Sequence, residues 1–176
     1  FVPLERSMRI LGIDPGTIAL GYGVIDDSPG IIGTTMVDYG VIFTPVRSPI
    51  WERLRFLYRR LEEVVEHYRP DVVAIEQPFV AKNARSAIAI GQAQAVAILA
   101  TSNQGITVYE YTPTQVKQRV ADHGTSSKEQ IQEMVKLHLG LHTIPQPSDA
   151  ADALAVALCH LSETHLTNRL AKQKEG

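Results

Sequence analysis

Residues 8–43 read MRILGIDPGTIALGYGVIDDSPGIIGTTMVDYGVIF. Three segments of this stretch are rich in β-branched and aromatic residues: MRILGID (8–14), LGYGVID (20–26) and IIGTTMVDYGVIF (31–43). Short turns that contain proline and glycine separate them. Close spacing of this kind predicts three consecutive antiparallel strands.

Downstream of these strands, helical and strand patterns alternate. The expected elements are a helix over 51–68, a strand over 71–76, a helix over 83–102 and a strand over 106–111, then helices over 114–122, 128–139 and from 148 onward. Strands that alternate with helices imply a parallel portion of the sheet with right-handed crossovers. The sequence therefore predicts an α/β fold with a central five-stranded mixed sheet, three antiparallel strands followed by two parallel ones, flanked by helices.

The overall composition is that of one soluble globular domain. The chain has 176 residues, of which 44% are hydrophobic and 20% charged. The single Cys159 excludes a disulfide framework within the chain and fits a reducing, cytoplasmic location. No apolar run reaches the roughly 18 residues of a membrane helix. We expect one domain over 8–162, an upstream or cloning remnant over 1–7, and a flexible polar tail over 163–176.

The net charge argues weakly against nucleic acid as a partner. The chain carries 17 Lys and Arg against 19 Asp and Glu, with a formal net charge of −2 and a pI near 6.3. If several of the carboxylates bind a metal ion, however, the remaining balance turns positive. Composition therefore leaves nucleic acid open.

Four acidic residues stand where isolated charge is unfavourable. Asp14 ends the first predicted strand in ILGIDPGT, and Glu76 ends the fourth in VVAIEQPF. Asp149 and Asp152 lie three residues apart in the first turn of the helix SDAADALAVALCH (148–160), on one helix face. Each has an ordinary alternative role, because a strand-end acid can cap a turn and a helix N-terminus favours acidic side chains.

Together the four acids predict a metal site. In open α/β sheets, sites form at the carboxyl ends of strands, and the start of the last helix could join them there. A hard divalent cation would relieve the repulsion, and an all-oxygen set points to Mg²⁺ or Mn²⁺. Two metal ions about 3.5–4 Å apart support in-line phosphodiester cleavage.

The helix over 83–102 is apolar on almost every side. One side can face the sheet, and the other requires a second apolar partner. We expect a homodimer interface here, with a two-layer core as the alternative.

The motifs GIDPG, AIEQ-x-F-x-AKN-x-x-SA, GQA, QVKQ, K-x-Q-x-x-MV and DAADALA, in this order, resemble those of the bacterial RuvC Holliday-junction resolvases. The resemblance covers Met8 to about Ser162. It implies an RNase H-like fold and a homodimeric, Mg²⁺-dependent endonuclease of DNA recombination and repair that cuts two strands of a four-way DNA junction symmetrically. It also implies the RuvA–RuvB branch-migration complex as a partner. On the matching motifs, Asp14, Glu76, Asp149 and Asp152 fall at the catalytic, metal-binding acids.

Four further residues are candidates for DNA contacts. Phe79, three residues after Glu76, could stack on an unpaired base or pack as a core residue. Lys82 could contact a phosphate or lie at a solvated helix start. Lys117 and Lys128 lie near predicted helix N-termini, where the dipole does not favour a cation, so a phosphate partner would explain them.

Three other functions are alternatives to this interpretation. An actin-like phosphotransferase, suggested by GIDPGT, requires a second lobe and a second phosphate loop that this chain lacks. A non-catalytic junction-binding protein would be signalled by loss of one of the acids. An RNase H-like nuclease of RNA or of RNA–DNA hybrids is excluded only by the family resemblance.

Overall fold

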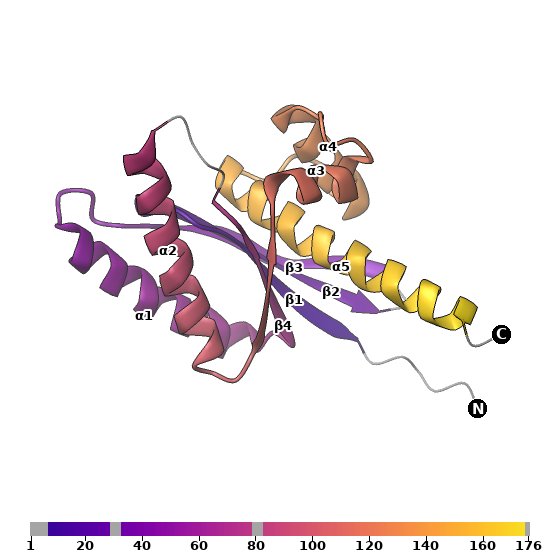
Figure 1. Ribbon diagram of the computed structural model, residues 1–176, viewed down its shortest axis with the longest axis horizontal. Helices are drawn as coiled ribbons and strands as arrows, with labels where there is room; N and C mark the ends of the chain where they lie inside the picture. Colours follow the sequence, from indigo (N-terminus) through magenta and orange to yellow (C-terminus); the bar gives the residue numbers. More distant parts are fainter. Residues whose placement is uncertain (1–6, 29–32, 79–82, 175–176) are drawn as a thin grey trace.

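Five strands form one mixed sheet at the centre of the chain, seen in a computed structural model that describes residues 7–28, 33–78 and 83–174 (Figure 1). The strands are β1 (Met8–Asp14), β2 (Ala19–Ser28), β3 (Gly33–Phe43), β4 (Val72–Glu76) and β5 (Thr107–Tyr111). Their order is β3-β2-β1-β4-β5. The pairs β1–β2 and β2–β3 are antiparallel, whereas β1–β4 and β4–β5 are parallel. The predicted sheet is therefore confirmed.

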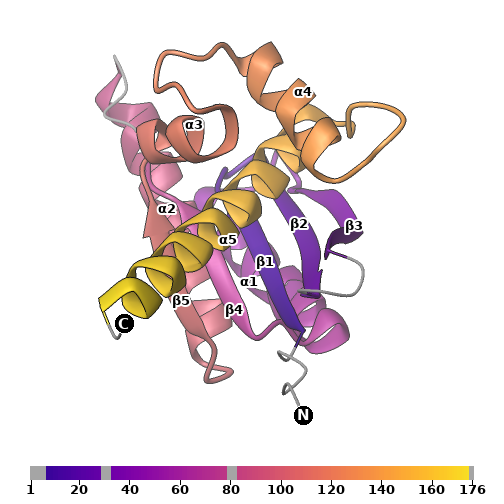
Figure 2. The ribbon, with the colours of Figure 1, turned by 90° about the vertical axis from the view of Figure 1, so that its right-hand side faces the viewer.

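Helices cover both faces of this sheet. They are α1 (Ile50–Tyr68), α2 (Ala84–Ser102), α3 (Pro113–Ala121), α4 (Lys128–His138) and α5 (Ser148–Lys174). Figure 1 shows α1 and α2 on one face and α5 on the other. Figure 2 shows α5 crossing the sheet obliquely, with α3 and α4 beside its first half. None of these helices, in the parts of the chain that the structure describes, is both long and apolar enough to cross a membrane.

The central strand β1 is apolar along most of its length because both of its faces are covered. Leu11 and Ile13 are fully buried in the core under α1 and α2. Ile10 belongs to the second core, under α5, α3 and α4. A strand covered on both faces loses the alternation of polar and apolar residues.

The last helix is longer than the sequence suggested. The expected polar tail from residue 163 is instead the continuation of α5, which ends at Lys174. Two contacts hold this part against the fold: Glu163 pairs with Arg119 of α3 at 2.6 Å, and His165 contacts the buried Asp27 of β2 at 2.9 Å. Extending an existing helix is also easier than nucleating one, so a polar sequence continues as helix here.

Candidate active site

Two of the four predicted acids meet because β1 and β4 are parallel neighbours. Ile13 is in register with Ile75, so the next residue of each strand, Asp14 and Glu76, stands at the same edge of the sheet. Their carboxyl groups share a hydrogen bond, which Asp14 donates to Glu76. The strand-end positions predicted from sequence are thus adjacent in space.

Helix α5 brings the other two acids to this edge through an unusually close approach to the sheet. A Cβ atom on Gly21 would lie 2.0 Å from the carbonyl oxygen of Asp149, and one on Gly12 would lie 2.1 Å from that of Ala153. Gly21 is also paired with Asp14 across β1 and β2. Only glycine permits this contact between strand and helix backbones.

Sequence reasoning missed these two glycines. Their signal was present, since each interrupts a β-branched strand at a position where a side chain would normally pack. A glycine inside a strand often marks close approach by another backbone. The sequence does not say which backbone approaches.

The electrostatic environment at Asp14 is strongly negative. Burial raises the pKa of Asp14 to about 8, and the charges of Glu76, Asp152 and Asp149 add to the effect. Burial likewise raises the pKa of Glu76, although its hydrogen bond from Asp14 works in the opposite direction. The other three carboxylates therefore all act on Asp14.

Two lysines from α3 and α4 partly compensate this charge. Lys128 Nζ lies 2.7 Å from Asp152 Oδ2. Burial lowers the pKa of Lys128, but its hydrogen bond to Asp152 and the acidic charges outweigh that effect and raise it overall. The charges of Lys128 and Lys117 both stabilise ionised Glu76.

The same two lysines line a pocket against the acids. This pocket has a volume of about 260 Å³, and its lining residues are Glu76, Pro113, Val116, Lys117, Lys128, Ile131, Asp152 and Ala155. A capping box of Ser127 and Gln130 fixes the first turn of α4, which carries Lys128. The pocket thus combines two carboxylates, Glu76 and Asp152, with two ammonium groups, Lys117 and Lys128, a combination that suits a phosphate beside a metal ion.

The donor set fits a divalent cation. It consists of carboxylate oxygens, which Mg²⁺ and Mn²⁺ prefer. After burial, the charges of the three neighbouring carboxylates are what raise the pKa of Asp14, and a cation would offset them. Within the described residues, no three acidic, His or Cys side chains are already drawn together as a ligand group. The contacts that the structure shows around these acids are the hydrogen bond between Asp14 and Glu76 and the ion pair between Lys128 and Asp152.

The remaining DNA-contact candidates, Phe79 and Lys82, lie outside the described residues. The structure describes the chain on either side, up to Pro78 and again from Asn83, where Asn83 caps the N-terminus of α2.

Comparison with known proteins identifies the family to which this chain belongs. A profile described as crossover junction endodeoxyribonuclease RuvC matches residues 10–160 of this chain. The chain belongs to the RuvC family. A RuvC from Dehalococcoides mccartyi is 53% identical over 165 residues, which cover 94% of this chain and 98% of that protein. One from Chloroflexus aggregans is 51% identical over 153 residues, covering 87% and 92%.

Solved structures agree with this assignment. Thermus thermophilus RuvC in complex with a Holliday junction substrate has a TM-score of 0.84 at 37% identity, covering 91% of this chain and 96% of that one. The yeast mitochondrial Holliday junction resolvase Ydc2 shares the fold, with a TM-score of 0.67 at 12% identity and coverage of 97% and 86%. The RNase H-like resolvase fold expected from the motifs is confirmed.

Proposed function

We propose that this RuvC chain resolves four-way DNA junctions by hydrolysing phosphodiester bonds at the site formed by Asp14, Glu76, Asp149 and Asp152. The observation that carries this proposal is the convergence of the four acids at one sheet edge. Lys117 and Lys128 line a pocket together with two of these acids, Glu76 and Asp152. A non-catalytic member of the family would have no need to keep four mutually repelling carboxylates, which lower the stability of the fold.

The substrate is assigned through the family. The Thermus thermophilus relative is described in complex with a Holliday junction substrate, and the profile match covers the whole of the candidate site. The actin-like phosphotransferase is disfavoured because the described residues form a single sheet with one such edge. Hydrolysis of RNA–DNA hybrids is the alternative that the experiment below must exclude.

The four acids would hold the metal ions, with two Mg²⁺ per site and Mn²⁺ as a substitute. When bound, these ions would supply charge neutralisation at the scissile phosphate and an activated water molecule. The chain itself holds the carboxylates in place through β1, β4 and α5. Asp14 itself is only partly buried, so it remains accessible to a cation.

The lysines would bind the DNA backbone. Lys128 contacts Asp152 in the free protein, and a phosphate entering the pocket would give its ammonium a second anionic partner. Lys117, on the same wall, would contact the same backbone. We propose phosphate contact for Lys82 and base stacking for Phe79 at an opened junction, on the strength of the family motif alone.

One experiment tests the activity and its substrate. The protein is incubated in parallel with a synthetic four-way junction, a linear duplex and an RNA–DNA hybrid, each with Mg²⁺ and with EDTA. We expect symmetric cutting of the junction alone, only with Mg²⁺, and loss of cutting but not of junction binding in Asp152→Asn. Preferential cutting of the hybrid would replace the proposed substrate, and cutting by Asp152→Asn at the wild-type rate would remove that residue from the site.

We further propose a homodimer built on α2. The helix buries Ala93, Ala97 and Ala100 against the rest of the chain, yet Ile88 and Leu99 are 64% and 53% exposed. Ile88, Gln92, Ala95 and Leu99 follow one another at intervals of four, three and four residues, the spacing of a helix-packing stripe. A second copy of the chain would cover this stripe and supply the second active site that symmetric cutting requires.

Two proposals rest on family membership only. The RuvA–RuvB branch-migration complex is the expected partner at the junction. The cytoplasm is the expected location.

A further inference from the structure

The segment that joins β3 to α1 lies at the same edge of the sheet as Asp14. Gly21 of β2 pairs with Asp14, the last residue of β1. Two residues earlier in β2, Ala19 pairs with Phe43, the last residue of β3. Figure 1 shows α1 and α5 beginning toward the same end of the sheet, on its opposite faces. Residues 43–55, which we call the arginine surface, therefore stand beside the candidate active site.

Hydrogen bonds tie this surface to the turn that follows Asp14. The Thr44 hydroxyl donates to the carbonyl of Thr17 at 2.7 Å, and Arg53 Nη1 donates to the same carbonyl at 3.5 Å. Thr17 is the third residue after Asp14, so the Cα atoms of these two residues lie at most about 11 Å apart. Successive nucleotides of one strand are about 3.4 Å apart along the duplex axis. The Arg53 guanidinium is therefore only a few nucleotides away from a phosphate bound beside Asp14.

The arginine surface carries positive charge that the chain does not neutralise. It contains three arginines and one glutamate, whereas the whole chain has a net charge of −2. Among the ion pairs of the described residues, none includes Arg47, Arg53 or Arg55. The Arg55 guanidinium lies instead 5.5 Å from the centre of the Trp51 ring. Glu52 stands in the first turn of α1, where the helix dipole already favours an acidic side chain.

Arg53 has hydrogen-bond donors in excess of its partners. A guanidinium has five N–H donors, and the hydrogen bond that Arg53 makes within the chain is the long one to Thr17. Its Nε is buried without a hydrogen-bond partner, alone among the buried side-chain nitrogen and oxygen atoms of the described residues. A buried donor of this kind requires an explanation. Phosphate is an anion whose geometry matches the arginine side chain.

Large apolar side chains are exposed on and beside the same surface. The exposed fraction is 57% for Ile18, 62% for Phe43, 62% for Val46 and 59% for Trp51. Exposed apolar groups in one place mark an interaction site. Aromatic rings interleaved with arginines are typical of surfaces that follow a nucleic-acid strand, because the rings pack against bases while the cations contact phosphates.

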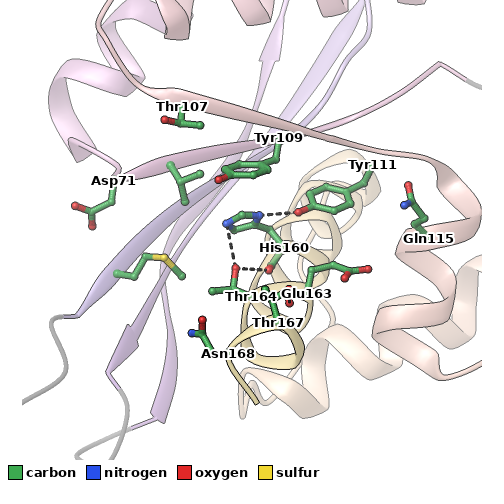
Figure 3. A pocket seen from close by; sticks show the side chains of 12 residues that line it. Asp71, Thr107, Tyr109, Tyr111, Gln115, His160, Glu163, Thr164, Thr167 and Asn168 are labelled. Atoms are coloured by element: carbon green, nitrogen blue, oxygen red, sulfur yellow. Dashed lines mark hydrogen bonds between the residues drawn. The ribbon is translucent and has the colours of Figure 1, made fainter. Parts of the chain in front are cut away.

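The groove between β5 and α5 does not have this character (Figure 3). Its volume is about 590 Å³, with Tyr109 and Tyr111 on the β5 side and His160 on the α5 side. In the described chain, no Lys or Arg is among its lining residues, and its Glu163 is already paired with Arg119. This groove therefore offers a DNA backbone no positive charge.

We infer that the arginine surface is a second DNA-binding surface, on the opposite side of Asp14 from Lys117 and Lys128. The strand order places β2 and β3 on one side of β1, and β4 and β5 on the other. The two lysines line the pocket beside Glu76, at the end of β4. A DNA strand that crosses the site is then held on both sides of the scissile phosphate. This inference rests on the proposed function, since it requires DNA in the active site.

Trp51 reports directly on this surface, because it is the single tryptophan of the chain. Its fluorescence is quenched with acrylamide, a neutral molecule, in the full chain with and without a synthetic four-way junction. EDTA is present, so that no cutting occurs, and binding is followed in parallel by anisotropy of labelled DNA. We expect quenching to fall at least ~2-fold on the bound junction, because a protein–DNA interface here would cover the ring.

Two results of this measurement would overturn the inference. The first is unchanged quenching of Trp51 when the junction is fully bound. The second is quenching that falls as the protein concentration rises without DNA, which would identify a second copy of this chain as the occupant.

Charge variants test the arginines themselves. Arg47→Gln combined with Arg55→Gln removes two exposed charges. It should weaken junction binding at least ~10-fold and lower the slope of log affinity against log salt by about one unit for each arginine. Arg69→Gln is the matched control, at the other end of α1 and about 24 Å from Arg53 along the helix, and should change neither quantity. Equal slopes in the double variant and the wild type would contradict the inference.

Arg53 is tested by two substitutions, because its side chain is partly buried. Arg53→Gln should lower the salt slope by about one unit. Arg53→Lys keeps the charge but not the planar fork of donors, so it should keep the wild-type slope and bind the junction more weakly. A wild-type slope and affinity in a folded Arg53→Gln would remove Arg53 from the surface.

The inference and the proposed activity fail in different ways. A chain that cuts the junction with Mg²⁺ but leaves Trp51 open to acrylamide would contradict the arginine surface alone. A chain that binds the junction and protects Trp51, but does not cut with Mg²⁺, would contradict the proposed activity alone.

Discussion

Asp14 carries the most consequential charge in the site, because burial and three other carboxylates oppose its ionisation. In the free protein it shares a proton with Glu76, while Asp152 is held by Lys128. Each contact reduces the repulsion among the four carboxylates. We therefore expect a cation that binds beside Asp14 to compete with protons for this carboxylate.

The first prediction concerns pH and the stability of the metal-free protein. The pKa of Asp14 rises from 3.8 to about 8 on folding, so the folded chain keeps a proton that the unfolded chain releases. The contribution of Asp14 to the free energy of unfolding is fully present below about pH 4. It falls as the pH rises toward 8 and does not change further above that pH. Asp14→Asn should remove this slope and stabilise the protein at pH 8 by on the order of a few kcal/mol.

Urea unfolding in EDTA at about pH 5 and pH 8 measures this effect. The control variant is Gln173→Arg, because it leaves every buried charge in place. Asp26→Asn is unsuitable as a control, because Asp26 forms an ion pair with Arg9. An identical pH slope in wild type and Asp14→Asn would show that Asp14 is already ionised in the folded chain.

The second prediction concerns Lys128 and DNA. If its ammonium contacts a phosphate, Lys128→Ala should weaken junction binding and reduce the slope of log affinity against log salt by about one unit. The measurement is a salt titration of binding with Ca²⁺ or EDTA present, so that no cutting occurs. An unchanged slope would mean that Lys128 serves only to neutralise Asp152.

At the scale of elements, the site depends on how closely α5 approaches the sheet. The glycines at positions 12 and 21 allow the helix backbone to contact β1 and β2. Asp149 and Asp152 lie in the first turns of that helix. A small displacement of α5 would therefore move two of the four acids relative to the other two.

The third prediction tests this contact. In Gly21→Ala the new Cβ would lie 2.0 Å from the Asp149 carbonyl oxygen, so the helix must shift, at a cost of about 1–3 kcal/mol. Cleavage should fall more than the loss of folded protein explains, because the acids separate. In Gly91→Ala, where the added Cβ meets open space in α2, stability should rise by about 0.5–1 kcal/mol. Wild-type stability and cleavage in Gly21→Ala would show that α5 is not held so closely.

The fourth prediction concerns the exposed stripe of α2. Leu99→Glu should yield folded monomers, because a charge would lie within the proposed interface. Leu137→Glu is the matched control, since Leu137 on α4 is 66% exposed and lies outside the stripe. Sedimentation measures both variants; a wild-type monomer at micromolar concentration, or a dimeric Leu99→Glu, would contradict the proposal. Ile98 is unsuitable for this test because it packs against the core.

At the scale of the whole molecule, metal binding and folding stability should be coupled. The four acids come from three separate elements, β1, β4 and α5, so a cation that binds them all binds only the folded chain. A ligand that binds only the folded state stabilises it by an amount that grows with its concentration, about 2.7 kcal/mol at 100 times Kd.

The fifth prediction follows from this coupling. Mg²⁺ should raise the unfolding temperature of the wild type, with the largest increase near or above about pH 8, where Asp14 is ionised without competition from protons. Asp14→Asn should show a much smaller increase. Calorimetry with Mg²⁺, and with NaCl at equal ionic strength as the control, distinguishes specific binding from general screening. Equal increases in both proteins would mean that Mg²⁺ binds elsewhere.

Most of the fold was predictable from sequence because its signals are local. Strand composition, turn residues and helical periodicity identified every strand and helix to within about three residues at most boundaries, and the acids at the ends of two apolar strands indicated where a site would form. Local sequence signals did not predict the end of the last helix, because residues distant in the chain determine it. The polar residues after 162 continue as helix because Arg119 and Asp27 lie beside them in space.

The sequence by itself determined the order of the elements, the mixed character of the sheet, and which acids, lysines and aromatic residue to consider. Only the tertiary structure decided that Asp14 shares a proton with Glu76, that Lys128 pairs with Asp152, and that two strand glycines set the position of α5. It also revealed the groove beside β5, whose two walls lie about fifty residues apart in the chain. Periodicity and composition predict which residues of each segment are buried. The distances between segments cannot be predicted in this way, because they are set only when the sheet and the helices pack together.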